Sequence, residues 1–313
     1  MIENVISRTI QLLFIMIVGF YARKRKFIDR GNVQALARLL SNITNPLLII
    51  CSFQMPFDKN IMSTGLTIFA GGIVIHVVTA VICYFVFRSK TNPKDNVVYE
   101  LNTLFANCGF MGFPILAAIY GDKLGIMYGA FYNTVFNLCF WSYGIAMLSR
   151  HERQGGKKQK LDFKKLFLNP GIIATVVGFI LFICEVKIPD ALLGGMDMVG
   201  DATFPLAMII IGALIVELDL KTAFKDLKLY ICLFLKLLAF PLATLGICLL
   251  CGANTIVTQV LVVLSGMPSA TLGAVFAEIY GTNPINAAKL VCITTVISVG
   301  TIPLLLYITN LFV

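Results

Sequence analysis

The stretch NCGFMGFP, residues 107–114, lies in the middle of an apolar run that is long enough to cross a membrane as a helix. Inside a helix, glycine costs about 1 kcal/mol and proline about 3 kcal/mol relative to alanine. Hydrocarbon offers no water to the backbone groups that such residues free, so irregular backbone is tolerated there only inside protein or beside a water-filled cavity. Gly109, Gly112 and Pro114 therefore predict a break in this helix that serves a function.

The composition of the whole chain indicates a polytopic membrane protein. Of its 313 residues, 58% are hydrophobic and 13% are charged, and the mean hydropathy is +0.88; soluble domains carry far more charge. We assign the formal net charge of +9 to cytoplasmic loops, so no nucleic-acid partner is expected. The nine cysteines are scattered through apolar runs, and the pair Cys248 and Cys251 lacks a second pair. We therefore expect no metal site and no cofactor.

The apolar runs predict about ten membrane helices. They cover residues 6–22, 33–55, 62–87, 97–120, 124–149, 168–186, 191–216, 229–251, 255–280 and 285–311. Lysine and arginine concentrate in alternate loops, and the positive-inside rule places those loops in the cytoplasm. The prediction is a multi-pass protein of the plasma membrane, surrounded by the lipid bilayer, with both termini outside.

Short motifs recur at an offset of 159 or 160 residues and divide the chain into two halves. IVGF (17–20) returns as VVGF (176–179), SNITNPL (41–47) as GDATFPL (200–206), and LAAIYG (116–121) as FAEIYG (276–281). We predict a first five-helix repeat at residues 1–150, a cytoplasmic linker at 151–166 and a second five-helix repeat at 167–313. An odd number of helices in each half inverts the second repeat, which is an architecture of secondary transporters. The expected fold class is thus all-α.

The second half carries its own break, SGMPSATLG at residues 265–273. The segment after each break begins a new half-helix, whose first N–H groups are unpaired and carry partial positive charge. Two such ends that meet suit an anion, most simply a carboxylate. The alternative is a pair of ordinary proline kinks, but the matched pair favours a site. The predicted substrate-binding residues in the two breaks are Asn107, Gly109, Gly112, Pro114, Gly266, Pro268, Ser269 and Thr271.

Further polar residues lie inside other predicted helices. Asp201 falls near mid-membrane, where a carboxylate is expensive and usually functional, so we expect it to handle a coupling proton or sodium ion. Lys236 either binds substrate or extends to the inner surface. Asn42, Asn45 and Thr203 either face the site or patch backbone loosened by Pro46 and Pro205. Asn133 and Asn137 lie one turn apart on one predicted helix and are expected to line the cavity. The additional predicted substrate-binding residues are Asn42, Asn45, Asn133, Asn137 and Lys236, and the coupling residues are Asp201 and Thr203.

ANCGFMGFP (106–114), GMPSAT (266–271) and the ten-helix inverted repeat resemble the auxin efflux carrier family along essentially the whole chain. That family includes bacterial malate-permease-type carriers and plant auxin exporters. The resemblance implies a scaffold of helices 1, 2, 6 and 7 and a transport domain of helices 3–5 and 8–10. It also implies that broken helices 4 and 9 cross at Pro114 and Pro268, an elevator-type motion, and organic-anion substrates such as malate or an auxin-like acid. The short linker departs from the long loop of many plant members.

The leading interpretation is a secondary active transporter of a small organic anion, not an enzyme, and the sequence allows a homodimer. One alternative is an anion channel, because paired half-helices also occur in pores. The other is an intramembrane enzyme, since VGDA (199–202) is faintly similar to the Gly-Asp motif of intramembrane aspartyl proteases. That chemistry needs two carboxylates on facing helices, and Asp197 lies one turn from Asp201 on the same predicted helix. We therefore expect no catalytic residues.

Overall fold

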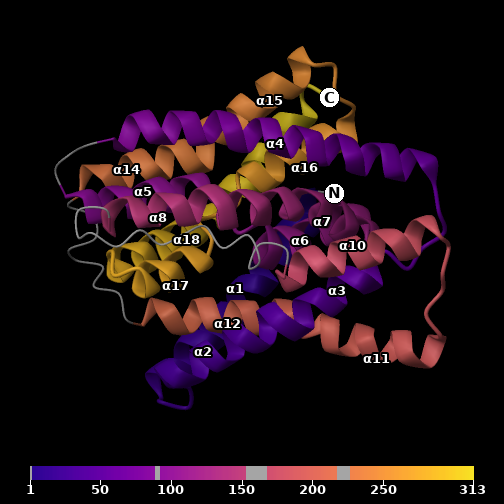
Figure 1. Ribbon diagram of the computed structural model, residues 1–313, viewed down its shortest axis with the longest axis horizontal. Coiled ribbons are helices and arrows are strands. Elements are labelled where there is room, and N and C mark those ends of the chain that lie inside the picture. Colours follow the sequence, from indigo (N-terminus) through magenta and orange to yellow (C-terminus); the bar gives the residue numbers. More distant parts are fainter. Residues whose placement is uncertain (1, 89–91, 153–167, 217–225) are drawn as a thin grey trace. The chain divides into compact units, whose positions relative to one another are not determined.

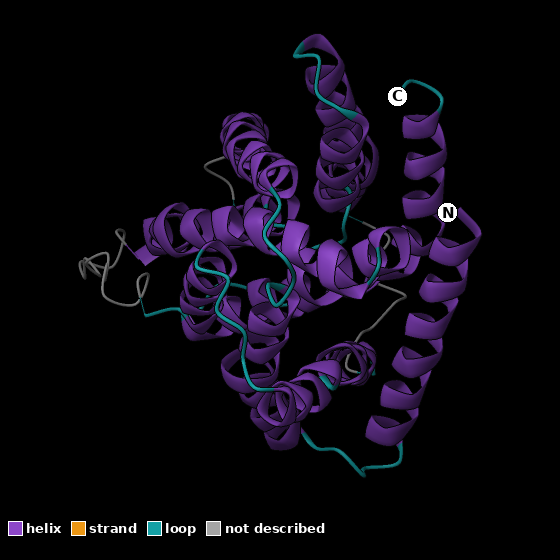
Figure 2. Cartoon of the chain, turned by 90° about the vertical axis from the view of Figure 1, so that its right-hand side faces the viewer, coloured by secondary structure: helices purple, strands orange, loops and turns teal. Residues whose placement is uncertain are grey.

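The computed structural model describes residues 2–88, 92–152, 168–216 and 226–313. In these residues every regular element is a helix, and the helices are joined by short loops (Figure 2). The predicted cytoplasmic linker, residues 151–166, lies outside the described residues from position 153 onward.

Helices form along all the predicted apolar runs. The first half contains α1 (Ile2–Lys24), α2 (Arg30–Leu39), α3 (Asn45–Ser52), α4 (Lys59–Phe87), α5 (Pro93–Leu104), α6 (Phe113–Tyr120), α7 (Asp122–Cys139) and α8 (Ile145–Glu152). The second half contains α10 (Pro170–Ile183), α11 (Asp190–Asp201), α12 (Thr203–Ile215), α14 (Leu227–Phe234), α15 (Phe240–Leu250), α16 (Thr255–Ser265), α17 (Leu272–Ile279) and α18 (Pro284–Asn310). Wider π-helical turns form η1 (Leu40–Thr44), η2 (Cys108–Gly112), η3 (Phe140–Gly144) and η4 (Leu235–Ala239).

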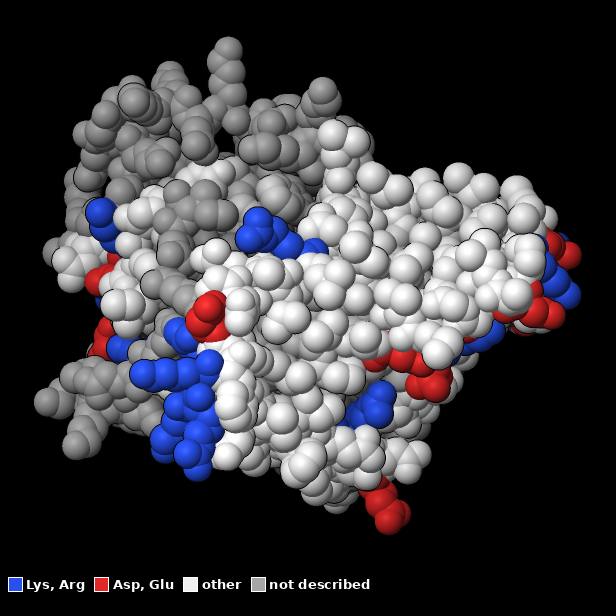
Figure 3. Space-filling view, turned by 90° about the horizontal axis from the view of Figure 1, so that it is seen from below, with Lys and Arg blue, Asp and Glu red and all other residues white. Residues whose placement is uncertain are grey.

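Six helical stretches in the described residues are long and apolar enough to cross a membrane. They are Glu3–Lys24, Gly31–Ser52, Lys59–Phe87, Asp190–Ile215, Leu227–Leu250 and Pro284–Asn310. Large apolar side chains cover their outer surfaces: Phe14 on α1 is 66% exposed and Phe85 on α4 is 68% exposed. In Figure 3 the charged side chains form separate clusters, and broad patches of the surface drawn there carry no charge. Such surfaces suit lipid, so the chain is an embedded multi-pass protein.

Three of the π-helical turns are explained by proline. η1, η2 and η4 each end two residues before a proline, at Pro46, Pro114 and Pro241. Proline lacks an N–H group and its ring crowds a carbonyl of the preceding turn, so that turn widens instead of breaking. The sequence thus yields bulged helices at these positions.

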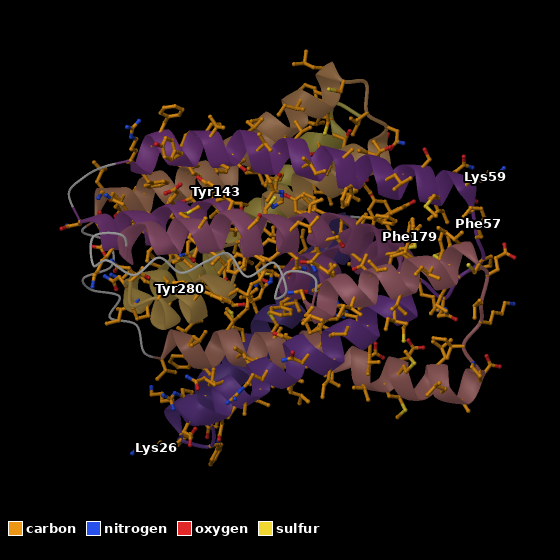
Figure 4. All side chains as sticks on the ribbon, in the orientation of Figure 1. Lys26, Phe57, Lys59, Tyr143, Phe179 and Tyr280 are labelled. Atoms are coloured by element: carbon orange, nitrogen blue, oxygen red, sulfur yellow. The ribbon has the colours of Figure 1, made fainter. Side chains whose placement is uncertain are left out.

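The described helices form two compact units, of which the first comprises Met1–Phe69, Gly109–Thr134 and Phe167–Val216. In it α1 runs along α12, and α3 packs against α10 and α11 (Figure 1). Glycine permits the close approach of α1 and α12, because a side chain at Gly19 would meet the backbone of Ile209. Lys26 and Lys59 lie on opposite sides in Figure 4. The chain between them, through α2 and α3, therefore crosses this unit.

The second unit comprises Ala70–Cys108, Val135–Leu166 and Glu217–Val313, and α5 lies at its centre. α5 packs against α8, α14, α17 and α18, and Figure 1 shows it beside α14. Polar contacts fix its first turns: the Tyr99 hydroxyl donates to Asp226 at 2.6 Å, and Lys228 donates to Asn96 at 2.6 Å. Asp226 also caps α14. These contacts tie the first turns of α5 to the start of α14.

Candidate functional site

The predicted breaks of helix 4 (residues 97–120) and helix 9 (residues 255–280) meet inside the second unit. These numbers count the ten predicted membrane helices and are separate from the α labels. Helix 4 stops at Leu104 and resumes at Cys108, and helix 9 stops at Ser265 and resumes at Leu272. The N–H of Asn107 donates to the carbonyl of Pro268 at 2.7 Å, and the N–H of Ala270 donates to the carbonyl of Phe105 at 3.0 Å. We call residues 105–107 and 268–270 the paired breaks; they form an antiparallel bridge between Ala106 and Ser269.

Pro114 does not mark the break in helix 4, which corrects the expectation from sequence. The backbone is helical without interruption from Cys108 through Pro114 to Tyr120, and Pro114 lies in the first turn of α6. Proline is tolerated there because, in the first turn of α6 after a widened turn, no backbone hydrogen bond from its nitrogen is required. In helix 9 the expectation is correct, since Pro268 lies within the break.

Polar side chains tie the paired breaks to the surrounding helices. The Ser269 hydroxyl donates to the backbone carbonyl of Asn102 at 2.8 Å. The Ser269 N–H donates to the Thr294 hydroxyl on α18 at 3.0 Å, and that hydroxyl donates in turn to the carbonyl of Leu290 at 2.6 Å. The Asn102 carbonyl lies in the last turn of α5, where the helix leaves carbonyls unpaired. The broken backbone is therefore almost fully hydrogen-bonded.

Lys236 brings a buried cation to the same place. It lies on η4 with 1% of its side chain exposed, so it does not extend to a surface of this chain. Its ammonium donates to the carbonyl of Leu104, the last residue of α5, at 3.4 Å. A cation at a helix C-terminus is favourable, but one neutral carbonyl does not neutralise a buried charge.

Two buried amides beside the paired breaks are incompletely paired. Asn107 is 4% exposed, and its Nδ2 has no hydrogen-bond partner among the described residues. Asn102 is 1% exposed, and its Oδ1 lacks a partner in the same part of the chain. Buried polar atoms are nearly always paired, so each atom calls for a water or a ligand. Asn107 supplies an unused donor and Asn102 an unused acceptor.

Apolar and aromatic side chains pack around the start of the break. The Phe105 ring lies 5.0 Å from the ring of Phe140 and 5.5 Å from that of Phe136, between centroids. The Phe140 ring in turn lies 5.1 Å from that of Phe276 on α17. Buried His76 belongs to the same group, with its ring 6.3 Å from that of Phe105. The polar atoms of the paired breaks thus adjoin an apolar wall.

The remaining residues predicted from the two breaks, and the two asparagines predicted on α7, are buried or half-buried. In the second unit Gly266, Pro268 and Thr271 are buried, and Asn137 is buried on α7. In the first unit Gly112 and Pro114 are buried and Gly109 is half-buried. A side chain at Gly109 would come within 3.5 Å of the Asn133 amide oxygen, so those two residues are neighbours.

The second predicted group lies in the first unit and is mixed in exposure. Asn42 is exposed and donates to the carbonyl of Arg38 at 2.8 Å, as expected for a side chain that patches loosened backbone. Asn45 and Thr203 are buried, and Asn45 Oδ1 and Thr203 Oγ1 have no described partner. Asp201 is exposed at the last residue of α11, beside the interruption before α12. In the described ranges no cluster of His, Cys, Asp or Glu is arranged to hold a metal ion.

Sequence reasoning missed Asn102 and Thr294. Both lie within helical runs that show no glycine or proline nearby, so local pattern gives no reason to single them out. The one signal in the sequence is that Asn102 lies five residues before Asn107 in the same predicted membrane helix, where two amides are unusual. Only the pairing of the two breaks places Asn102 beside Ser269.

Comparison with known proteins gives consistent matches along the chain. The model of a family described as membrane transport protein matches residues 4–306. The chain is 24% identical to the uncharacterized transporter YfdV of Escherichia coli K12, with 99% of each protein covered. It is 25% identical to an uncharacterized transporter of Methanothermobacter thermautotrophicus, with 96% of each covered. An uncharacterized transporter of Methanocaldococcus jannaschii is 23% identical, with 94% of this chain covered.

Proposed function

Because the chain belongs to the membrane transport protein family, which is the auxin efflux carrier family, we propose that it is a secondary active transporter of a small organic anion. Membership of a transporter family also favours transport over the intramembrane enzyme considered from sequence. The relatives named above are uncharacterized as to substrate, so the substrate class must be argued from the chemistry of the paired breaks.

The observation that carries the proposal is the buried charge of Lys236. In the described residues its ammonium has one neutral acceptor, Leu104 O, and a buried charge without a counter-charge is strongly unfavourable. A bound anion would supply that counter-charge. The unpaired Nδ2 of Asn107, three residues beyond Leu104, offers a second donor. A carboxylate, which only accepts hydrogen bonds, matches this set of donors.

The wall beside these donors favours an organic body on the anion. Phe105, Phe136 and Phe140 are buried and pack against one another, so the surroundings of these donors are apolar. Aromatic surface of this kind binds hydrocarbon and excludes water. A small carboxylic acid, such as malate or an auxin-like acid, meets both requirements, because its carboxylate matches the donors and its hydrocarbon part suits apolar surroundings.

For the mechanism we propose alternating access by an elevator-type movement. Helices 3–5 and 8–10 would carry the anion past a scaffold of helices 1, 2, 6 and 7, within two inverted five-helix repeats. A proton or sodium ion would drive accumulation, with Asp201 and Thr203 as the coupling residues. Both termini would lie outside the plasma membrane, and a homodimer is compatible with the proposal. An anion channel with the same site is the alternative.

Neutralising Lys236 tests the proposal at the level of binding. In Lys236→Met the substrate carboxylate loses a charge-assisted hydrogen bond, so its affinity should fall roughly tenfold to a hundredfold. The measurement is titration calorimetry of purified protein with mono- and dicarboxylates. Lys59→Met, at the exposed first residue of α4, removes the same charge elsewhere and should leave affinity unchanged. Equal affinity in wild type and Lys236→Met would contradict the proposal.

A further inference from the structure

We propose that Asn102 selects organic acids that carry a neutral hydrogen-bond donor, most simply a hydroxyl group, in addition to the carboxylate. This inference rests on the proposed function, since it concerns the same site and narrows the substrate class. It is carried by one atom, the Asn102 Oδ1, which lies beside the paired breaks without a partner in the described residues.

The orientation of the Asn102 amide is fixed by its other hydrogen bond. Its Nδ2 donates to the carbonyl of Val98, one turn earlier on α5, at 2.8 Å. That carbonyl can only accept, so turning the amide over would set two acceptors against each other. Oδ1 is therefore the atom that remains free, and it requires a donor.

The surroundings of Asn102 also hold the amide in place. Its own backbone carbonyl accepts the Ser269 hydroxyl at 2.8 Å. On the side of α17, a Cβ at Gly273 would lie 2.6 Å from Oδ1 and within 3.3 Å of the rest of the amide. Any larger residue at 273 would therefore displace the amide or cover its oxygen. Glycine at this position lets the buried Oδ1 keep its place with its hydrogen-bonding capacity unused.

Asn102 and Asn107 both lie beside Ser269, and their unpaired atoms differ: Asn102 has a free acceptor and Asn107 a free donor. Ser269 pairs with Ala106, next to Asn107, while its hydroxyl contacts Asn102. The free Nδ2 of Asn107 suits a carboxylate, but the free Oδ1 of Asn102 repels one, because both are acceptors. A single ligand satisfies both amides if it presents an acceptor to Asn107 and a donor to Asn102.

The donor is expected to be neutral. Lys236 already places a buried ammonium at the same break, and a second cation nearby would be repelled. The nearest carboxylate along α5, Glu100, accepts a hydrogen bond from the hydroxyl of Tyr143 at 3.0 Å (Tyr143 is labelled in Figure 4). A hydroxy acid therefore fits these charges better than an amino acid does.

The test compares acids that differ only by the hydroxyl group. L-lactate is paired with propionate and L-malate with succinate, and the affinity of each for purified full-length protein is measured by calorimetry. In the wild type at least one hydroxy acid should bind roughly five- to tenfold more tightly than its partner, as expected for one neutral hydrogen bond. In Asn102→Leu this preference should disappear, while the deoxy acid keeps its wild-type affinity within about threefold.

Two further variants keep the test decisive. Gly273→Ala places a methyl group against Oδ1 and should remove the same preference, so it assigns the effect even if Asn102→Leu does not fold. Thr103→Val changes a buried neighbour on α5 whose hydroxyl donates to Cys232 Sγ at 2.8 Å, and it should keep the preference. The role of Asn102 would be refuted if the wild type bound both members of each pair equally. It would also be refuted if the preference persisted in Asn102→Leu or in Gly273→Ala. Either outcome leaves the proposed function standing. If none of the four acids binds the wild type, the proposed function fails as well.

Discussion

At the residue scale, Asn107 and Asn102 each bury one amide atom that has no hydrogen-bond partner among the described residues. Asn107 was predictable because it opens a motif whose glycines and proline are anomalous in a membrane helix. Asn102 lies in a regular helix, and its importance follows from contacts with residues more than 160 positions away. Local propensity carries no information on such contacts. The unpaired atoms of both residues emerge only from the folded arrangement.

Asp201 is the residue-scale prediction for coupling. Its carboxylate is exposed on the single chain at the end of α11, inside a stretch long enough to span the membrane. At the mid-membrane depth that the sequence predicts for Asp201, a carboxylate is costly unless it is protonated, paired or bound to an ion. Asp201→Asn should therefore abolish accumulation driven by an ion gradient while substrate exchange persists. Uptake of labelled acid with and without the gradient measures both; wild-type accumulation in the variant would refute the coupling role.

At the scale of elements, the position of the break in helix 4 is the main correction to the sequence analysis. Residues 105–107 contain neither glycine nor proline, yet the helix stops there. Hydrogen bonds to Pro268 and from Ala270 replace the helical ones, so tertiary pairing decides the position. Gly109, Gly112 and Pro114, the local signals, produce a widened helical turn instead. In helix 9, by contrast, Pro268 and the break coincide, so local and tertiary preferences agree.

If tertiary pairing sets the position of the break, removing Pro114 should have little effect, and placing a proline at position 270 should damage the paired breaks. Pro114→Ala lies inside a helix that continues on both sides, so carboxylate affinity should stay within about threefold of the wild type. Ala270→Pro removes the N–H that donates to Phe105, and the unpaired carbonyl should destabilise the protein by about 1–3 kcal/mol. Thermal unfolding and calorimetry of both variants check this. A carboxylate affinity in Pro114→Ala that falls well beyond threefold, or an unchanged stability in Ala270→Pro, would contradict this position of the break.

At the scale of the whole molecule, the apolar runs predicted where helices form but not their internal structure. Each run is helical in the described residues, because length and apolarity suffice to specify a membrane helix. Six stretches qualify as spans by length and composition. Helices 4 and 9 are each divided into shorter pieces. The inverted ten-helix arrangement stays a prediction, supported by the repeated motifs and the paired breaks.

The orientation of the molecule gives a separate prediction. If the positive-inside rule holds for the basic loops, reporter domains fused after Val313 should report an external C-terminus. Fusions within residues 153–165 should report the cytoplasm. Alkaline phosphatase and fluorescent-protein fusions at both places, in intact cells, make the measurement. A cytoplasmic C-terminus would require an odd number of spans, given an external N-terminus, and would exclude two inverted five-helix repeats.

The central claim is that a carboxylate is carried across the membrane at the paired breaks, and counterflow tests it most directly. Purified protein is reconstituted in liposomes loaded with unlabelled acid, and a trace of labelled acid is added outside. A carrier predicts that label transiently accumulates above its external concentration, and that Asn107→Leu reduces this overshoot at least tenfold, because the donor to the carboxylate is lost. Label that only equilibrates would indicate a channel, and an undiminished overshoot in Asn107→Leu would contradict the paired breaks as the site.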